Sequence, residues 1–220
     1  METRSAKYLI NKDFPKEVRF KLASSVSTAY SNVNSLKEEI EIFQFPLVTN
    51  IVPYIKNIAV AYHIKNNIDN NILSSYEYKY EFNAARNHRY LKIISKNFYL
   101  TINQVENENT TPRGAIYRNK LLSKNEKQLS LFEKQDNVTK IKKPDKYYAM
   151  LTHGYQEDFP FFINLGVPKT YNKGWEYKIN LLNETYETDI TNNKPEEEKE
   201  EELVKLKDHI KEVQKNATWK

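Results

Sequence analysis

The chain has 220 residues, of which 39% are hydrophobic and 29% are charged, and its formal net charge at pH 7 is +5. This length suits one domain with appendages, and neither a GxGxxG nor a GxxxxGK(S/T) motif occurs, which argues against the familiar nucleotide-binding folds. The absence of cysteine excludes disulfides, thiolate nucleophiles and cysteine-based zinc sites. The sequence shows no membrane-spanning run and no signal-peptide core, so we expect a soluble, cytoplasmic protein with no membrane partner.

The charge is unevenly distributed along the chain. Residues 184–220 contain 11 acidic and 7 basic residues, a net charge of −4, which leaves +9 on residues 1–183. A basic body with an acidic tail indicates a polyanionic partner for the body. The alternative is ordinary charge that keeps the protein soluble.

Helical spacing of apolar residues dominates the N-terminal part of the chain. We expect Asp13 to cap a first helix, with Pro15 in its first turn. Ser35 followed by Glu38 matches a capping box, which predicts a second, short helix over residues 36–43.

Residues 47–64 form the most apolar segment, and their spacing of three and four predicts a buried helix. The residues of this apolar repeat are Ile51, Tyr54, Ile55, Ile58, Ala59, Tyr62 and His63. The Asn-rich residues 65–71 are expected to form a loop.

The stretch over residues 75–105 carries the strongest strand signal. Aromatic residues recur at every second position from residue 76 to residue 82, so they are predicted to share one face of a strand, with Glu77, Lys79 and Glu81 on the other. Two further apolar runs, residues 90–94 and 98–105, predict a hairpin whose tip contains Lys96 and Asn97.

The remaining elements are predicted from shorter signals. Ser123 and Glu126 match a capping box, which predicts a helix over about residues 124–132. Strands are predicted at residues 147–152, 159–165 and 175–181, the second ended by residues 166–168. Leu203, Leu206, Ile210, Val213 and Ala217 repeat at three and four, which predicts an acidic amphipathic helix over residues 196–217.

Together these elements predict an α+β fold, because runs of helices precede runs of strands instead of alternating with them. We expect N-terminal helices packed on a largely antiparallel sheet of about five or six strands. The expected organisation is a single domain over residues 1–183, with a helical part at 1–66 and a sheet part at 75–182. Residues 184–220 would form an acidic linker and a C-terminal helix.

Basic and aromatic residues near the predicted sheet make nucleic-acid binding the preferred hypothesis. Guanidinium groups accept phosphate through forked hydrogen bonds, and aromatic rings stack on exposed bases. The candidate binding residues are Arg86, His88, Arg89, Lys92, Lys96, Arg113 and Arg118. We expect a non-enzymatic binding protein that contacts nucleic acid through a basic, aromatic edge of the sheet, in a bacterial regulatory or phage-defence context. A solvated turn is the alternative for the cluster around Arg86.

A second hypothesis is a Mg²⁺-dependent nuclease that uses Asp69, Glu77 and Lys79. Glu77 and Lys79 would share a strand face, and Asp69 would supply the second carboxylate for the metal. The position of Asp69 in an Asn-rich loop argues against it. A metal-free ribonuclease would use His88 or His153 for proton transfer. Under every other hypothesis we expect no metal and no cofactor.

The third hypothesis is a protein-interaction role, as an antitoxin-like partner or an inhibitor. An aromatic-rich surface and a short amphipathic helix suit the recognition of another protein. The helix predicted over residues 196–217 is the candidate contact segment.

Overall fold

The computed structural model describes residues 5–133, 146–154, 158–170 and 174–184. Main-chain contacts group the chain into two units, Met1–Leu181 and Leu182–Lys220. The first unit contains the described α-helices and β-strands. The C-terminal helix predicted over residues 196–217 lies outside the described residues.

The first unit begins with a helical part of five elements. They are, in chain order, α1 (Ala6–Asp13), α2 (Lys16–Glu39), the 3₁₀ turns η1 (Glu41–Gln44) and η2 (Pro46–Asn50), and α3 (Val52–Asp69). Helix α2 buries Leu22, Val26, Ala29 and Val33, whose spacing of three and four places them on one face. Helices α2 and α3 contact each other along their lengths.

Several helix predictions are wrong at their boundaries. Helix α2 continues through Ser35, so the capping box at that position does not begin a new helix. Asp13 is the last residue of α1, a helix that was not predicted, and Pro15 occupies the cap position of α2. Helix α3 extends to Asp69, so the loop predicted from residue 65 is mostly helical.

The buried face of α3 also differs from the prediction. Val52, Lys56, Val60 and Ile64 are buried, a stripe with a spacing of four. The exposed stripe consists of Ile51, Tyr54, Ile58 and Tyr62, whose side chains are 51%, 53%, 50% and 58% exposed. Because α3 carries apolar residues on two stripes, periodicity alone does not determine which stripe faces the core.

Six strands form one sheet in the order β1-β2-β3-β4-β5-β6. Their bounds are β1 Glu77–Phe82, β2 Arg89–Ile94, β3 Phe98–Gln104, β4 Tyr147–His153, β5 Ile163–Pro168 and β6 Trp175–Asn180. All neighbouring pairs are antiparallel except β3 and β4, which are parallel and joined through α4 (Ile116–Glu133). The α+β class and the N-terminal helices followed by a six-stranded, mostly antiparallel sheet confirm these parts of the predicted fold.

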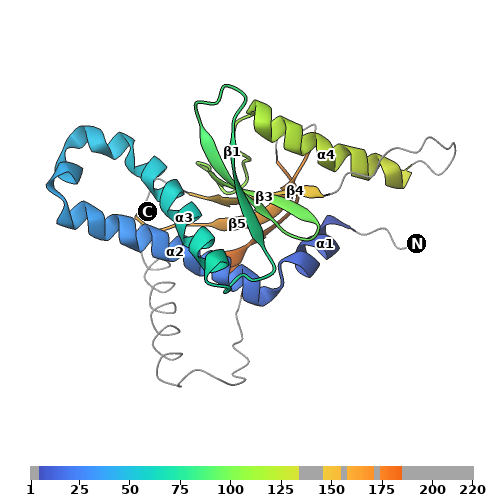
Figure 1. Ribbon diagram of the computed structural model, residues 1–220, viewed down its shortest axis with the longest axis horizontal. Helices are drawn as coiled ribbons and strands as arrows, with labels where there is room; N and C mark the ends of the chain where they lie inside the picture. Colours follow the sequence, from blue (N-terminus) through green and yellow to red (C-terminus); the bar gives the residue numbers. More distant parts are fainter. Residues whose placement is uncertain (1–4, 134–145, 155–157, 171–173, 185–220) are drawn as a thin grey trace, which may run out of the picture. The chain divides into compact units, whose positions relative to one another are not determined.

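The sheet separates two layers of helices (Figure 1). On one face, the Phe14 ring that follows α1 lies 5.8 Å from the ring of Phe98, and Tyr30 of α2 contacts His153. On the other face, α4 packs through Leu121 against Tyr148 and other residues of β4. Both faces of the sheet bury polar residues within a mainly apolar core: Lys56 and His153 on the side of α1–α3, and Thr101 on the side of α4.

The β2–β3 turn is fixed to the end of α1. One carboxylate oxygen of Asp13 accepts hydrogen bonds from the Ser95 hydroxyl at 2.6 Å and the Asn97 amide N–H at 2.7 Å, and the other accepts from the Asn97 side chain. The Lys146 ammonium group donates to the carbonyl of Ser95. The tip predicted at residues 96–97 is therefore confirmed, and the side chains of Ser95 and Asn97 have partners within the protein.

Two sequence signals in the C-terminal half were misinterpreted. Residues 166–168 continue β5 instead of ending it, because Gly166 allows β6 to approach: a Cβ atom there would lie 2.4 Å from the carbonyl oxygen of Tyr177. Helix α4 begins at Ile116, so Ser123 lies inside it, and its hydroxyl donates to the carbonyl of Lys120. Among the described residues, no helix combines the length and the apolar character that are needed to cross a bilayer.

Candidate functional site

The sheet divides at the end opposite the β2–β3 turn. Strands β1 and β2 pair along all six residues, but β2 and β3 pair only from Lys92↔Thr101 to Ile94↔Tyr99. Residues 89–91 of β2 pair only with β1, and residues 102–104 of β3 pair only with β4. These two segments therefore do not pair with each other. We call this separation the strand fork.

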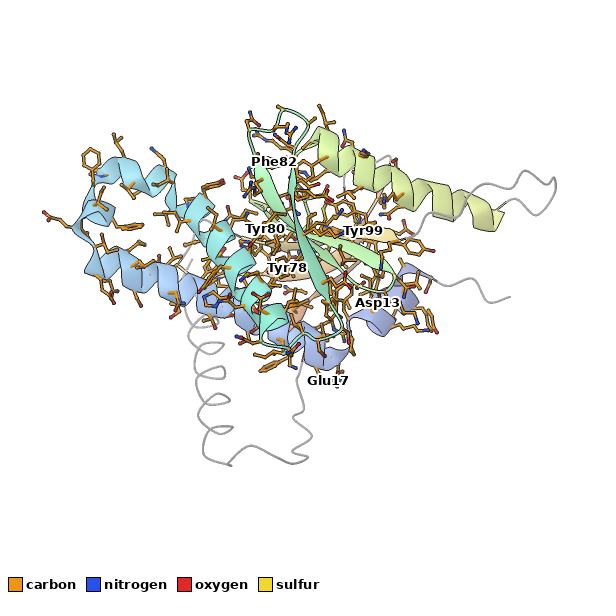
Figure 2. The ribbon with its side chains drawn as sticks, in the orientation of Figure 1. Asp13, Glu17, Tyr78, Tyr80, Phe82 and Tyr99 are labelled. Atoms are coloured by element: carbon orange, nitrogen blue, oxygen red, sulfur yellow. The ribbon has the colours of Figure 1, made fainter. Side chains whose placement is uncertain are left out.

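The strand fork opens into a cleft of about 980 Å³. Helix α3 and the β1–β2 hairpin form two of its walls, and the loop after β3 together with the start of α4 forms another. Its lining includes rings, amides and cations, among them Tyr54, Asn57, Tyr80, Arg89, Gln104 and Arg113. Tyr80 belongs to a row with Tyr78 and Phe82 along β1 (Figure 2). The shared face that the alternating sequence predicted is confirmed for these three rings, whereas Tyr76 precedes β1 and is buried against Phe14.

The connection between β1 and β2 presents two guanidinium groups beside one ring. Arg89 lies 4.6 Å and Arg86 lies 5.7 Å from the centre of the Phe82 ring, and both arginines are exposed. The Asn83 side-chain oxygen accepts hydrogen bonds from two main-chain N–H groups of the connection, at 3.1 and 3.2 Å. Arg86 has a φ of +56°, a left-handed conformation that few side chains adopt. The hydrogen bonds of Asn83 and the left-handed conformation of Arg86 therefore give the β1–β2 connection a defined conformation.

Arg113 and Arg118 differ in what they contact. Arg118 donates two hydrogen bonds to the carbonyl of Arg113, at 3.0 and 2.6 Å, and others to Asn103 at 3.1 Å and the Tyr117 hydroxyl at 2.6 Å. These hydrogen bonds hold the start of α4 against β3. The Arg113 side chain is exposed at the cleft and remains available for a ligand.

The structure does not bring all seven predicted binding residues together. His88, Arg89, Arg113 and Arg118 line the cleft, and Arg86 adjoins it on the connection. Lys92 forms an ion pair with Glu81 and lies over the Tyr99 ring, on the face that α4 covers. Lys96 lies in the β2–β3 turn, at the opposite end of β2. The cationic group at the cleft therefore excludes both lysines.

The three residues of the nuclease hypothesis do not meet. Asp69 at the end of α3 pairs with Lys65 and hydrogen-bonds the hydroxyl of Tyr78, and the Lys65 hydrogen bond holds the pKa of Asp69 below its usual value. Glu77 and Lys79 flank Tyr78 on the strand and therefore face the opposite side of the sheet. Within the described ranges, no group of three His, Asp or Glu side chains is placed to hold a metal ion.

The two histidines of the ribonuclease hypothesis lie in different environments. His88 is half-buried at the cleft, whereas His153 is fully buried behind it. The imidazole of His153 lies 2.8 Å from the Tyr30 hydroxyl through Nδ1 and 3.3 Å from the Asn57 side-chain oxygen through Nε2. Burial lowers the pKa of His153 to about 4, and the positive charge of Lys56 adds to this effect. His153 is thus neutral at pH 7 and shielded from any phosphate.

Most residues of the cleft lining are absent from the predicted site, among them Tyr54, Asn57, Tyr80 and Gln104. The helical spacing of Tyr54 predicts a core position, and the alternation around Tyr80 predicts only a strand face. Asn57 gave a usable signal, since an amide inside the most apolar segment of the chain needs a polar partner. Nothing in the sequence pattern marked Gln104.

A second exposed surface lies at the turn between α2 and α3. Its apolar residues, which we call the apolar tip, are Leu36, Ile40, Ile42, Phe45 and Leu47, with exposed fractions from 38% to 65%. This surface is separate from the residues that line the cleft. It gives the protein-partner hypothesis a location within the described residues, besides the segment 196–217.

The fold and the cleft define an α+β domain with a cationic and aromatic cleft at one end of its sheet. Comparison with models of protein families, with curated proteins and with solved structures finds no match.

Proposed function

We propose that the protein is a non-enzymatic nucleic-acid-binding protein and that the cleft at the strand fork holds the nucleic acid. One observation carries this proposal. Arg86, Arg89 and Arg113 are exposed around one cleft, and within the described part of the chain none of them pairs with a carboxylate. Cations without an acidic partner favour an anionic ligand, and guanidinium groups suit phosphate in particular.

The rings in the cleft favour a single strand over a duplex. The side chains of Tyr54 and Tyr80 are 53% and 56% exposed, although both line the cleft. An exposed ring next to cations can stack on an unpaired base while the cations contact the phosphates. A duplex keeps its bases stacked on each other, so it would use the cations and leave the rings without a role.

Fluorescence anisotropy with labelled single-stranded oligonucleotides of about 15 nucleotides tests this proposal. The cleft variant replaces Arg86, Arg89 and Arg113 by Ala, and the matched control replaces Lys12, Lys16 and Lys96, which are exposed near the β2–β3 turn. At about 150 mM salt we expect the cleft variant to lose about 30- to 100-fold in affinity and the control less than about threefold. The slope of log K against log salt should decrease by about 2 in the cleft variant, because each phosphate contact on a single strand contributes about 0.7.

Two results would overturn the proposal. One is the absence of measurable affinity of the wild-type protein at about 150 mM salt for either DNA or RNA. The other is an equal loss in both variants, which would mean that the total charge and not the cleft determines binding.

The same oligonucleotides separate the proposal from its two alternatives. We expect them to stay intact with Mg²⁺ present, and cleavage that disappears in Glu77→Ala would favour the nuclease hypothesis instead. A variant of the apolar tip, Phe45→Ser with Leu47→Ser, should keep full affinity. Loss of affinity in that variant would place the binding surface on the α2–α3 turn.

A further inference from the structure

Two amide side chains lie on the floor of the cleft, and the buried residues behind them determine how one of them is oriented. Asn57 of α3 and Gln104 of β3 both line the cleft. His153 pairs with Gln104 in the register of β3 and β4, and it hydrogen-bonds Asn57 through Nε2. The fully buried Tyr30 contacts the other ring nitrogen of His153.

Two contacts of Nδ1 favour opposite tautomers of His153, because the Gly154 carbonyl can only accept a hydrogen bond while the Tyr30 hydroxyl can donate one; we assign the tautomer from the shorter contact. Its Nδ1 lies closer to the Tyr30 hydroxyl, at 2.8 Å, than to the Gly154 carbonyl, at 3.2 Å. With the Tyr30 hydroxyl donating to Nδ1, the proton of the neutral ring is on Nε2, which then donates to the Asn57 oxygen at 3.3 Å.

This arrangement leaves the nitrogen of the Asn57 amide for the cleft. Its oxygen is directed back toward His153, and the NH₂ group is the other branch of the same planar amide. Asn57 therefore offers the cleft a hydrogen-bond donor whose orientation is fixed by the protein interior.

Gln104 carries a second donor, which reaches a ligand when its half-buried side chain turns toward the cleft that it lines. Its Nε2 atom is shielded from solvent and has no hydrogen-bond partner within the described part of the chain. A shielded N–H group without an acceptor is unfavourable, and in native structures such a group usually meets an acceptor that a ligand or water supplies. The residue lies on β3 within the strand fork and lines the same cleft as the rings of Tyr54 and Tyr80.

We propose that Asn57 and Gln104 determine which base the cleft accepts, by donating hydrogen bonds to the exocyclic carbonyl oxygen of an unpaired base. Thymine, uracil, guanine and cytosine carry such an oxygen, whereas adenine does not. His153 and Tyr30 act as positioning residues, because they hold the amide of Asn57 in the donating orientation. This inference rests on the proposed nucleic-acid binding and adds its base preference.

The test compares oligothymidylate with oligoadenylate of equal length, about 15 nucleotides, by fluorescence anisotropy. We expect the wild-type protein to bind oligothymidylate about tenfold more tightly. Asn57→Ala and Gln104→Ala should each reduce that ratio to about two or less, with an unchanged salt slope, because the phosphate contacts remain. Asn119→Ala removes an exposed amide from α4 outside the cleft lining and should leave the ratio at the wild-type value.

The positioning role has its own readout. His153→Gln keeps a donor toward Asn57 and an acceptor toward Tyr30, so it should preserve the base ratio, and His153→Ala should abolish it. If His153→Ala does not fold, as judged by circular dichroism, Tyr30→Phe serves the same purpose, since it removes only the hydroxyl that selects the tautomer of His153. We expect the base ratio of Tyr30→Phe to fall while its salt slope stays unchanged.

The outcomes distinguish this inference from the proposed function. An unchanged base ratio in Asn57→Ala and Gln104→Ala, or equal affinities of the wild-type protein for the two oligonucleotides, overturns the inference and leaves nucleic-acid binding intact. Failure of the wild-type protein to bind either oligonucleotide overturns the proposed function and the inference together.

Discussion

The two ends of strand β2 have similar compositions but different roles. At the β2–β3 turn, the carboxylate of Asp13 accepts hydrogen bonds from Ser95 and Asn97, and the ammonium group of Lys146 donates to a carbonyl of the turn. At the strand fork, the guanidinium groups of Arg86 and Arg89 contact only a ring among the described residues. Polar groups that satisfy each other stabilise the fold, whereas polar groups that face solvent in a cleft are available to a ligand.

This difference means that substitutions at the two ends should affect different measurements. Substitutions that remove the hydrogen bonds of the turn should lower the free energy of unfolding and leave ligand affinity in the folded protein unchanged. Substitutions at the strand fork should lower ligand affinity and leave the free energy of unfolding unchanged.

The largest expected effect is that of Asp13→Ala at the turn. The substitution removes three hydrogen bonds to a charged acceptor, and it leaves the main-chain N–H of Asn97 without its partner. We expect the free energy of unfolding to fall by about 3 to 4 kcal/mol, as measured by urea denaturation. Asp13→Asn keeps one acceptor oxygen and should lose about half as much. Equal stability of the wild-type protein and Asp13→Ala would contradict the structural role of the turn.

The second-largest expected effect is the pH dependence of stability that the buried His153 causes. The pKa of His153 is about 4 in the folded protein and near 6.5 in the unfolded chain, because its surroundings are buried and include the charge of Lys56. Between these values only the unfolded chain binds the proton, so stability falls as the pH decreases through this window. From pH 7 to pH 5 the loss attributable to His153 is about 2 kcal/mol.

Urea denaturation of the wild-type protein and His153→Gln at both pH values measures this contribution. Glutamine does not titrate, so the variant should lose about 2 kcal/mol less than the wild-type protein over the same interval. An identical pH dependence of the two proteins would show that His153 is not held neutral by the fold.

The smallest expected effects come from a matched pair of single substitutions, Arg89→Ala at the fork and Lys96→Ala at the turn. Both remove one exposed cation. Arg89→Ala should reduce oligonucleotide affinity by about fivefold, and Lys96→Ala by less than about 1.5-fold. Both should leave the free energy of unfolding within about 0.5 kcal/mol of the wild-type value. Equal losses of affinity would remove the contrast between the two ends.

The sequence predicted the sheet better than the cleft. Strand alternation is a local property, so the row of Tyr78, Tyr80 and Phe82 was predicted correctly. The cleft depends on where the β2–β3 ladder stops, after Lys92↔Thr101, and on which stripe of α3 is exposed. Both are set by packing between distant segments, which periodicity does not encode.

The candidate site was predicted in part for the same reason. Arg86, His88 and Arg89 are neighbours in sequence and stay together in the structure. Arg113 joins them because β3 runs from the β2–β3 turn to the fork end, where the loop between β3 and α4 lines the cleft. Lys96 is close to Arg89 in sequence, which is why the sequence predicts it in the same site. Strand β2 separates the two residues and places Lys96 at the end opposite the strand fork. Gln104 lines the cleft because β3 does not pair with β2 at this position.

Photo-crosslinking tests the central claim most directly, because it locates a bound oligonucleotide on the protein. An oligonucleotide that contains 4-thiothymidine would be crosslinked at saturation, and the modified peptides identified by mass spectrometry. We predict crosslinks within residues 54–58, 80–90 and 102–118, which surround the cleft. Crosslinks concentrated in residues 5–16 and 95–97, around the β2–β3 turn, would contradict the account.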